Sequence, residues 1–417
     1  MTVIVHCARG KNIMSIKHWL AFGATTIALT LPLSGMAQKR YDPGASDTEI
    51  KIGQTLPYSG PASAYATFGR VEAAYFRKIN DEGGINGRKI VFLSVDDGYS
   101  PPKTVEATRR LVEQDQVLLM FGSLGTPQNT AVHAYMNAHK VPQLFVFTGA
   151  TKWNDPLNHP WTMGLQINYQ TEAQIYAKHI LQTKPNAKIA VLSQNDDFGK
   201  DYVKGLKDGL GDKAGKMIVA EATYEANDPS VDSQVIQLQG SGADVFMNMS
   251  LPKTAAQAIR KAYDIGWKPT QYLSAVSFSV GAVLTPAGLD KSVGIISGVS
   301  GKDPTDPRWD NDAGMNEWRA FMKKYYPDGD LADGNNVSGY RAALLMVHVL
   351  RQCGDNLTHE NVMRQAASLK DFAAPTALPG ITFNTSPTDF APTKMMQLVR
   401  FNGKTWVPFG DVLGQHQ

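Results

Sequence analysis

The chain has 417 residues, with 41 lysines and arginines against 38 aspartates and glutamates. Residues 1–37 contain three of the basic residues and no acidic one, so the remainder carries 38 of each sign. This neutral balance, without a run of basic residues, argues against nucleic acid or an anionic membrane surface as the partner.

The N-terminus is typical of an export signal. Two lysines precede an apolar stretch, residues 19–33, which is too short to span a bilayer comfortably. Gly35 and Ala37 fit the minus-three and minus-one positions of a cleavage site. We therefore expect a signal peptide over residues 1–37, cleavage after Ala37 and a periplasmic protein. A retained anchor helix is the alternative, and Met14 is a second candidate start.

The whole chain has two cysteines, and removal of residues 1–37 leaves only Cys353. An exported protein with one cysteine has no internal disulfide, so its stability must come from buried cores. The remaining chain of about 380 residues is long enough for two cores. A small buried thiol is the expected state of Cys353, and a reactive thiol is the alternative.

Strand and helix patterns alternate along two successive blocks of the chain. The first block has strand patterns at residues 50–56, 89–95, 117–121 and 144–147, and helical spacing at residues 62–80, 101–113 and 127–138. The second has strand patterns at residues 188–193, 217–222, 244–249 and 271–275, and helical spacing at residues 170–182, 200–210, 231–240 and 253–265. Such alternation predicts parallel sheets with helices on both faces. Two blocks predict an α/β protein with two doubly wound lobes.

The third section, residues 298–392, is mainly helical. Its apolar faces predict helices at residues 316–326, 338–352 and 359–369, and a strand and hairpin follow at residues 395–406. Helices without strands of their own must pack on another sheet. We expect the chain to return to the first lobe, which requires a multi-stranded linker between the lobes.

Several short motifs occur in a fixed order from the first predicted strand onward. They are IGQTLPYSGP at residues 52–61, INDEGGINGR at 79–88, the acid pair at 96–97, GSLGT at 122–126, GAT at 149–151 and NDDFG at 195–199. Together they resemble the periplasmic solute-binding proteins of ABC transporters, of the Leu/Ile/Val-binding kind. The resemblance covers nearly all of residues 47–410.

The resemblance implies the type I periplasmic binding fold, with two parallel-sheet lobes joined by a three-stranded hinge. The expected first lobe is residues 47–167 plus 301–390, and the second is residues 168–300 plus 391–417. Such a protein is a monomer that closes on a small solute and presents it to a permease and its ATPase subunits. No cofactor and no enzymatic activity are expected.

The resemblance also implies the ligand residues. Ser123 and Thr126 match the first ligand loop, the GAT motif matches the second, Tyr65 matches an aromatic wall and Phe198 an aromatic from the other lobe. Thr126 before a proline predicts an N-cap, whose helix would direct free N–H groups at a ligand carboxylate. Capping alone, or packing for the aromatic rings, is the alternative role. The expected ligand-binding set is Tyr65, Ser123, Thr126, Gly149, Ala150, Thr151, Phe198, Leu251 and Val276.

Departures from the family pattern bear on the ligand. Amino-acid binders place an acid in the second lobe to neutralise the ligand ammonium, and residues 274–278 contain none. The aromatic ligand residue of those proteins falls near Leu251 and is missing here. Their disulfide would fall near Tyr99 and Gly125, and it is missing too. A buried ammonium without a counter-charge is costly. We therefore expect a carboxylate with an apolar or aromatic body, such as a benzoate or phenylpropenoid acid; an amino-acid binder or a ligand-sensing module is the alternative.

Motifs for catalysis are missing from the sequence. The first strand is not followed by a dinucleotide-binding glycine motif, and neither a Walker loop, a nucleophile elbow nor a zinc-protease motif occurs. The acid pairs at residues 96–97 and 196–197 could hold a metal, but acids at strand ends more often cap loops. We expect neither an enzyme nor a metal site.

Overall fold

The computed structural model describes residues 39–414, and the predicted signal peptide, residues 1–37, lies outside the described residues. Within the described part of the chain, no helix has the length and apolar character needed to cross a membrane.

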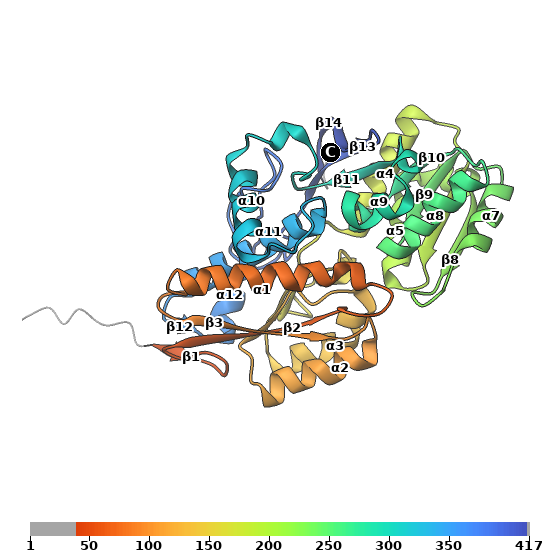
Figure 1. Ribbon diagram of the computed structural model, residues 1–417. Coiled ribbons are helices and arrows are strands. Elements are labelled where there is room, and N and C mark those ends of the chain that lie inside the picture. Colours follow the sequence, from red (N-terminus) through yellow and green to blue (C-terminus); the bar gives the residue numbers. More distant parts are fainter. Residues whose placement is uncertain (1–38, 415–417) are drawn as a thin grey trace, which may run out of the picture. The chain divides into compact units, whose positions relative to one another are not determined.

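A five-stranded parallel sheet forms the first lobe. Its strand order is β3-β2-β4-β5-β6. The strands are β2 (Glu49–Leu56), β3 (Lys89–Asp96), β4 (Leu119–Phe121), β5 (Gln143–Val146) and β6 (Thr162–Gly164). Helix α1 (Ala66–Asp81) covers one face, and α2 (Pro101–Arg109) and α3 (Thr126–His139) cover the other (Figure 1).

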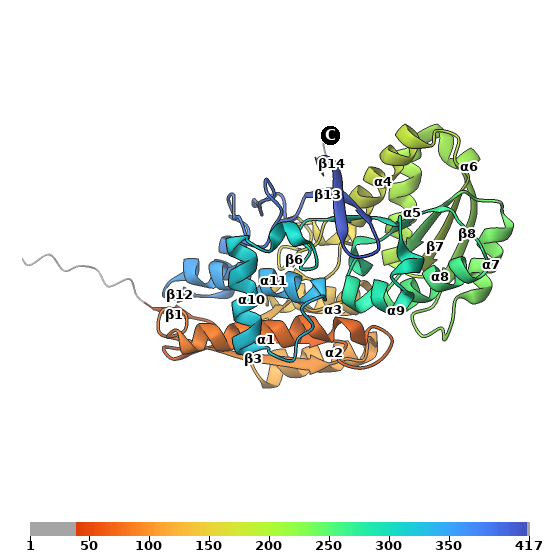
Figure 2. The same cartoon turned by 45° about the horizontal axis from the view of Figure 1, so that its top comes forward.

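A seven-stranded sheet forms the second lobe, in the order β14-β13-β11-β10-β9-β7-β8. Its strands are β7 (Ile189–Gln194), β8 (Ile218–Tyr224), β9 (Val245–Met249), β10 (Thr270–Leu273), β11 (Ile296–Val299), β13 (Met395–Phe401) and β14 (Trp406–Gly414). Five of them are parallel, whereas β13 and β14 are antiparallel additions at one edge. The helices around this sheet are α4 (Tyr169–Thr183), α5 (Asp197–Leu210), α7 (Asp232–Gly240) and α8 (Pro252–Asp264), with the short α6 (Ala214–Met217) and α9 (Thr285–Ala287) (Figure 2).

The central strands of the second sheet show why both faces need helices. Successive side chains of a strand point to opposite faces. Val191 and Met247 pack in a core with α4 and α5, while their neighbours Leu192 and Phe246 pack in a different core with α7 and α8. A strand that is buried on both faces reads as a continuous apolar run, which is the signature of a parallel sheet. The predicted α/β fold class is confirmed.

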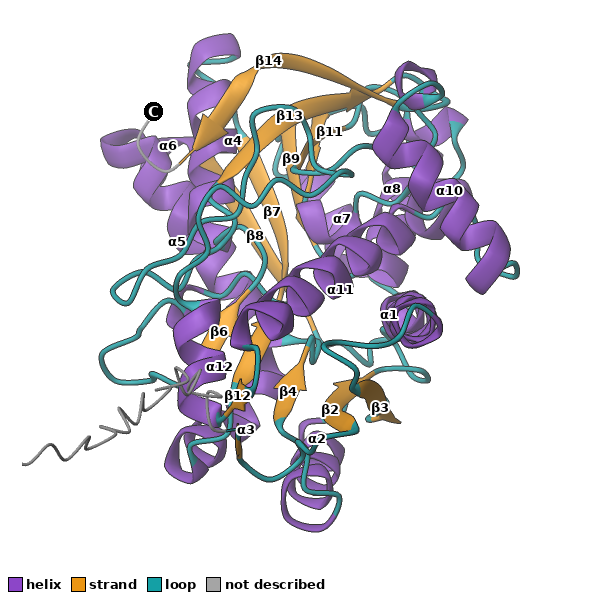
Figure 3. Ribbon diagram, turned by 90° about the vertical axis from the view of Figure 1, so that its left-hand side faces the viewer, coloured by secondary structure: helices purple, strands orange, loops and turns teal. Residues whose placement is uncertain are grey.

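Three helices of the third section cover the first lobe on the side of α1. Helices α10 (Ala313–Tyr325) and α11 (Gly334–Cys353) pack on α1, and α12 (His359–Ala366) packs on α11. One apolar core joins them to β2, β4 and α1. Helix α11 approaches α1 closely because Gly339 has no side chain: a Cβ there would lie 2.4 Å from Cγ1 of Val71. Figure 3 shows α11 beside α1. The two-residue strands β1 (Arg40–Tyr41) and β12 (Asn356–Leu357) pair in parallel.

Chain segments pass between the two sheets at three places, after β6, after β11 and before β13. The residue boundaries proposed for the lobes stay a prediction. The single described cysteine, Cys353, is free and buried. Burial raises the pKa of its thiol to about 12, so the thiol is protonated and unreactive at neutral pH.

Two local predictions differ from the structure. The helix expected over residues 101–113 is α-helical only to Arg109 and continues as a π-helical turn, Arg110–Gln114. Thr126 is the first residue of α3, and the N-cap is Gly125, whose φ of 103° favours a residue without a Cβ. The hydroxyl of Thr126 is therefore not the cap of this helix.

Candidate functional site

A cavity of about 110 Å³ lies between the two lobes. It is somewhat smaller than the ~150 Å³ apolar cavity that holds a benzene molecule in another protein. Aromatic and aliphatic residues form more than half of its lining, and they include Tyr65, Phe68, Tyr99, Leu124, Phe147, Tyr169, Phe198, Leu251, Val276 and Phe278. A space of this size and character suits a small solute with an apolar body.

Stacked rings form the first-lobe wall of the cavity. The ring centroids of Phe68 and Phe147 lie 4.2 Å apart with their planes tilted by 26°, and Tyr65 stacks on Phe68 at 5.7 Å. From the second lobe, Phe198 meets Tyr169 edge to face at 5.0 Å. Offset-stacked and edge-to-face pairs are favourable arrangements of aromatic rings, so these side chains stabilise one another's positions in the wall.

Tyr65 also joins the two lobes. Its hydroxyl donates a hydrogen bond of 2.8 Å to the main-chain carbonyl of Val276, which lies in the segment after β10. Burial raises the pKa of the Tyr65 hydroxyl well above its ordinary value, so it remains a donor. The ring therefore lines the cavity while the hydroxyl connects the lobes.

The loop at residues 122–126 lies beside the segment that leads into the GAT motif. The N–H of Gly125 donates to the carbonyl of Phe147 at 3.2 Å, and the N–H of Phe147 donates to the carbonyl of Ser123 at 3.0 Å. Parallel strands β4 and β5 bring their carboxyl ends together at this edge of the sheet.

The structure divides the nine predicted ligand residues into two groups. Those that line the cavity are Tyr65, Thr126, Phe198, Leu251 and Val276. Those that lie outside its lining are Ser123, Gly149, Ala150 and Thr151. Contact between any of them and a ligand stays a prediction.

Local contacts explain why the second group lies apart. The hydroxyl oxygen of Ser123 accepts a hydrogen bond from the N–H of Thr55 at 3.2 Å. Gly149 packs against the segment that leads into α4: a Cβ there would be 2.2 Å from the carbonyl oxygen of Ile167, and its own carbonyl accepts from Tyr169 at 2.8 Å. Ser123 and Gly149 therefore make their contacts with other parts of the protein and not with the cavity.

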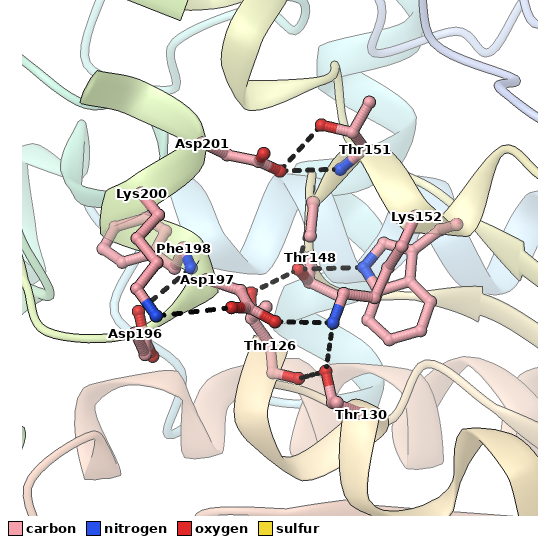
Figure 4. A network of polar contacts seen from close by, with 12 residues as sticks. Thr126, Thr130, Thr148, Thr151, Lys152, Asp196, Asp197, Phe198, Lys200 and Asp201 are labelled. Atoms are coloured by element: carbon pink, nitrogen blue, oxygen red, sulfur yellow. Dashed lines mark hydrogen bonds and ion pairs between the residues drawn. The ribbon is translucent and has the colours of Figure 1, made fainter. Parts of the chain in front are cut away.

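Thr151 is exposed and already holds a carboxylate (Figure 4). Its N–H and its hydroxyl both donate to the same oxygen of Asp201, each at 2.8 Å. The next residue, Lys152, pairs with Asp197 at 2.6 Å. Both acids belong to α5, so this loop makes contacts between the lobes outside the cavity lining.

Glu172 is a cavity residue that the sequence did not reveal. One carboxylate oxygen accepts from the N–H of Ala275 and from the hydroxyl of Tyr176, and the other accepts from the hydroxyl of Tyr202, all at 2.8 Å. Burial raises the pKa of this carboxyl to about 7. The second lobe therefore does place an acid next to the segment at residues 274–278, although it comes from α4.

One sequence signal could have found Glu172. It lies on the same helical face as Tyr169, Ala173 and Tyr176, which are buried. An acid on the apolar face of a helix is unusual and favours a functional site. Arg341, on α11, also lines the cavity and was equally unnoticed.

The acid pairs considered for metal binding serve as caps. Asp96 accepts from the N–H and the hydroxyl of Ser59, Asp97 accepts from Thr104, and Asp196 accepts from the first-turn N–H groups of α5. Among residues 39–414, no group of three histidine, cysteine or acidic residues is arranged to hold a metal ion.

Residues 49–405 match the model of a protein family described as periplasmic binding protein. The chain belongs to this family. Its members are substrate-binding proteins of the periplasm and not enzymes, as the resemblance implied.

Individual relatives are distant. The chain is 26% identical over 245 residues to Leu/Ile/Val-binding protein homolog 7 from Brucella abortus, which covers 55% of this chain and 59% of that protein. A branched chain amino acid ABC transporter protein from Thermus thermophilus, solved with bound valine, has a TM-score of 0.80 at 16% identity and covers 89% of this chain and 98% of its own. A fatty acid ABC transporter substrate-binding protein from Thermomonospora curvata has a TM-score of 0.76 at 20% identity, with 91% and 95% covered. At these identities the two solved structures establish the shared fold.

Proposed function

We propose that this protein is the substrate-binding component of an ABC importer. It captures a small organic carboxylate between its two lobes and delivers it, as a monomer, to a membrane permease and its ATPase subunits. The observation that carries the proposal is the cavity between the lobes, with walls contributed by both. A ligand that contacts both lobes binds the closed arrangement better than the open one and shifts the population toward it.

The lining favours a ligand with an apolar or aromatic body. Stacked rings and aliphatic side chains dominate the wall, and each Å² of apolar ligand surface that they cover contributes roughly 25 cal/mol. Benzoates and phenylpropenoid acids have this character, and so do short aliphatic acids. The protein solved with valine and the fatty acid ABC transporter substrate-binding protein both share the fold of this chain. The ligand must therefore be selected by the residues of the cavity and not by the fold.

An amino acid is the second candidate, and Glu172 is the observation that favours it. The carboxylate oxygen that accepts from Tyr202 has one protein donor, although a carboxylate oxygen can accept two. A ligand ammonium that reached this oxygen would have a counter-charge. Without Glu172, the acid-free segment at residues 274–278 would exclude a free amino acid.

A thermal-shift screen tests the two candidates against each other. Benzoate, cinnamate and hexanoate are compared with leucine, valine and phenylalanine at equal concentrations. Any ligand that binds only the folded state raises the melting temperature according to how far its concentration exceeds its dissociation constant. We expect the largest shifts from acids that lack an amine. Largest shifts from amino acids would replace the first candidate by the second.

A second measurement tests binding without turnover. Small-angle scattering with and without the best compound should show a smaller radius of gyration in its presence, and mass spectrometry should recover the compound unchanged. Chemical conversion of the compound by pure protein would contradict a binding role.

A further inference from the structure

One end of the cavity contains an arginine without an acidic partner. Arg341 lies on α11; the residue as a whole is partly buried, and Nη1 of its guanidinium is covered. Within residues 39–414, no carboxylate, Glu172 included, is close enough to pair with it, and burial alone lowers the pKa of the guanidinium to about 10. A cation placed in such surroundings is costly unless a counter-charge is supplied.

The neighbours of the guanidinium fix its position but leave donors unused. Nη2 donates to the hydroxyl oxygen of Ser300 at 3.2 Å, and the group lies 5.8 Å from the ring centroid of Phe383. Nη1 is covered and has no hydrogen-bond partner. Gly301 makes room for it, since a Cβ there would lie 2.3 Å from Nη1.

A second unused donor of α11 also lines the cavity. Asn335 is 2% exposed, lines the cavity, and its side-chain Nδ2 has no partner. Asn335 and Arg341 are six residues apart, with Ser338 between them, and all three line the cavity at helical spacing. Buried donors in folded proteins are almost always paired, so two unpaired donors in one cavity call for an explanation.

Lys302 is the second basic residue of the cavity lining, and it has the hydrogen-bond partners that Arg341 lacks. Lys302 donates to both oxygens of Asp312 at 2.7 Å and to the carbonyl of Pro375 at 2.8 Å. Of the two cationic side chains in the cavity lining, Lys302 therefore has an acidic partner and Arg341 has none.

We infer that Arg341 and Asn335 form the subsite that holds the ligand carboxylate. A planar guanidinium matches the two oxygens of a carboxylate, and the ligand would supply both the missing counter-charge and the missing acceptors. The inference rests on the proposed function and names the anchor of the ligand. The position of Ser123, Gly149, Ala150 and Thr151 outside the cavity lining agrees with an anchor elsewhere in the cavity.

The test replaces Arg341 by methionine, which keeps the length of the side chain and removes its charge. Arg351→Met is the matched control, because it makes the same exchange at an exposed position of the same helix. Benzoate, cinnamate and hexanoate are titrated calorimetrically against wild type and both variants, together with the primary amide of each acid.

For R341M we expect the affinity for the acids to fall by about tenfold to a hundredfold, because charge-assisted hydrogen bonds are lost. The amides, which carry no charge, should bind wild type and R341M alike. The melting temperature of ligand-free R341M should rise, since an unpaired buried cation is removed. R351M should show none of these changes.

Three results would overturn the inference. If R341M binds the acids as tightly as wild type while Thr126→Val loses them, the carboxylate lies at the start of α3 instead. If ligand-free R341M melts at a lower temperature than wild type and binds acids and amides with equal losses, Arg341 is merely structural. A wild-type protein that binds no carboxylate overturns the proposed function as well, whereas acid binding that is insensitive to R341M overturns this inference alone.

Discussion

Replacement of Glu172 by glutamine should change how the stability of the protein depends on pH. Glutamine has nearly the same shape, and its amide can still accept from Ala275 and Tyr176 while its NH₂ group faces the hydroxyl of Tyr202. The exchange therefore removes the ionisation of this buried group and retains its contacts.

The magnitude follows from the shift in pKa. Burial raises the pKa of Glu172 from 4.5 to about 7, so between these values the folded state holds a proton that the unfolded state has released. The contribution of Glu172 to the free energy of unfolding therefore falls as pH rises from about 4.5 to about 7 and is constant outside this window. At ~1.4 kcal/mol for each pKa unit, the loss is about 3 kcal/mol.

The assay is urea unfolding of wild type and E172Q at several pH values between 4.5 and 8. Other acids with raised pKa values, such as Glu72, Asp97, Asp196 and Asp333, lose stability in the same direction, but they are common to both proteins. The difference between the two curves isolates Glu172. Glu221→Gln, at an exposed position of β8, is the control for the exchange itself. If the wild-type and E172Q curves run parallel, the carboxyl is ionised throughout and the reasoning fails.

Three further predictions concern closure, packing and export. Tyr65→Phe removes the hydrogen bond to Val276 across the cavity and should weaken ligand binding by about twofold to tenfold in calorimetry; unchanged affinity would mean that the bond is absent in the bound state. Phe198→Ala removes a ring that is 2% exposed and should lower the free energy of unfolding by about 3–5 kcal/mol in urea, and a loss below ~1 kcal/mol would show that the site collapses. Mass spectrometry of the exported protein should find Gln38 at the N-terminus, and a chain that begins at Met1 or Met14 would contradict the predicted cleavage.

Local patterns determined the order of the elements and the two-lobed fold. Strands such as β2 and β9 follow from short apolar runs, and helices such as α5 from apolar residues at a spacing of three or four. These signals are local, because a strand or helix repeats its side-chain directions every two or 3.6 residues. Their alternation limits the chain to parallel sheets with helices on both faces. The π-helical turn after α2 escaped prediction, since nothing in the apolar spacing separates it from an α-helix.

Which residues line the cavity was decided by the tertiary structure. Thr151 has the hydroxyl and the position in its motif that a ligand loop requires, but Asp201, fifty residues later, occupies its donors. Glu172 and Arg341 look like ordinary helix residues in the sequence, and they line the cavity because α4 and α11 arrive there from opposite lobes. A charge is revealed as unpaired only when every neighbour within a few ångströms is known, and those neighbours come from distant parts of the chain.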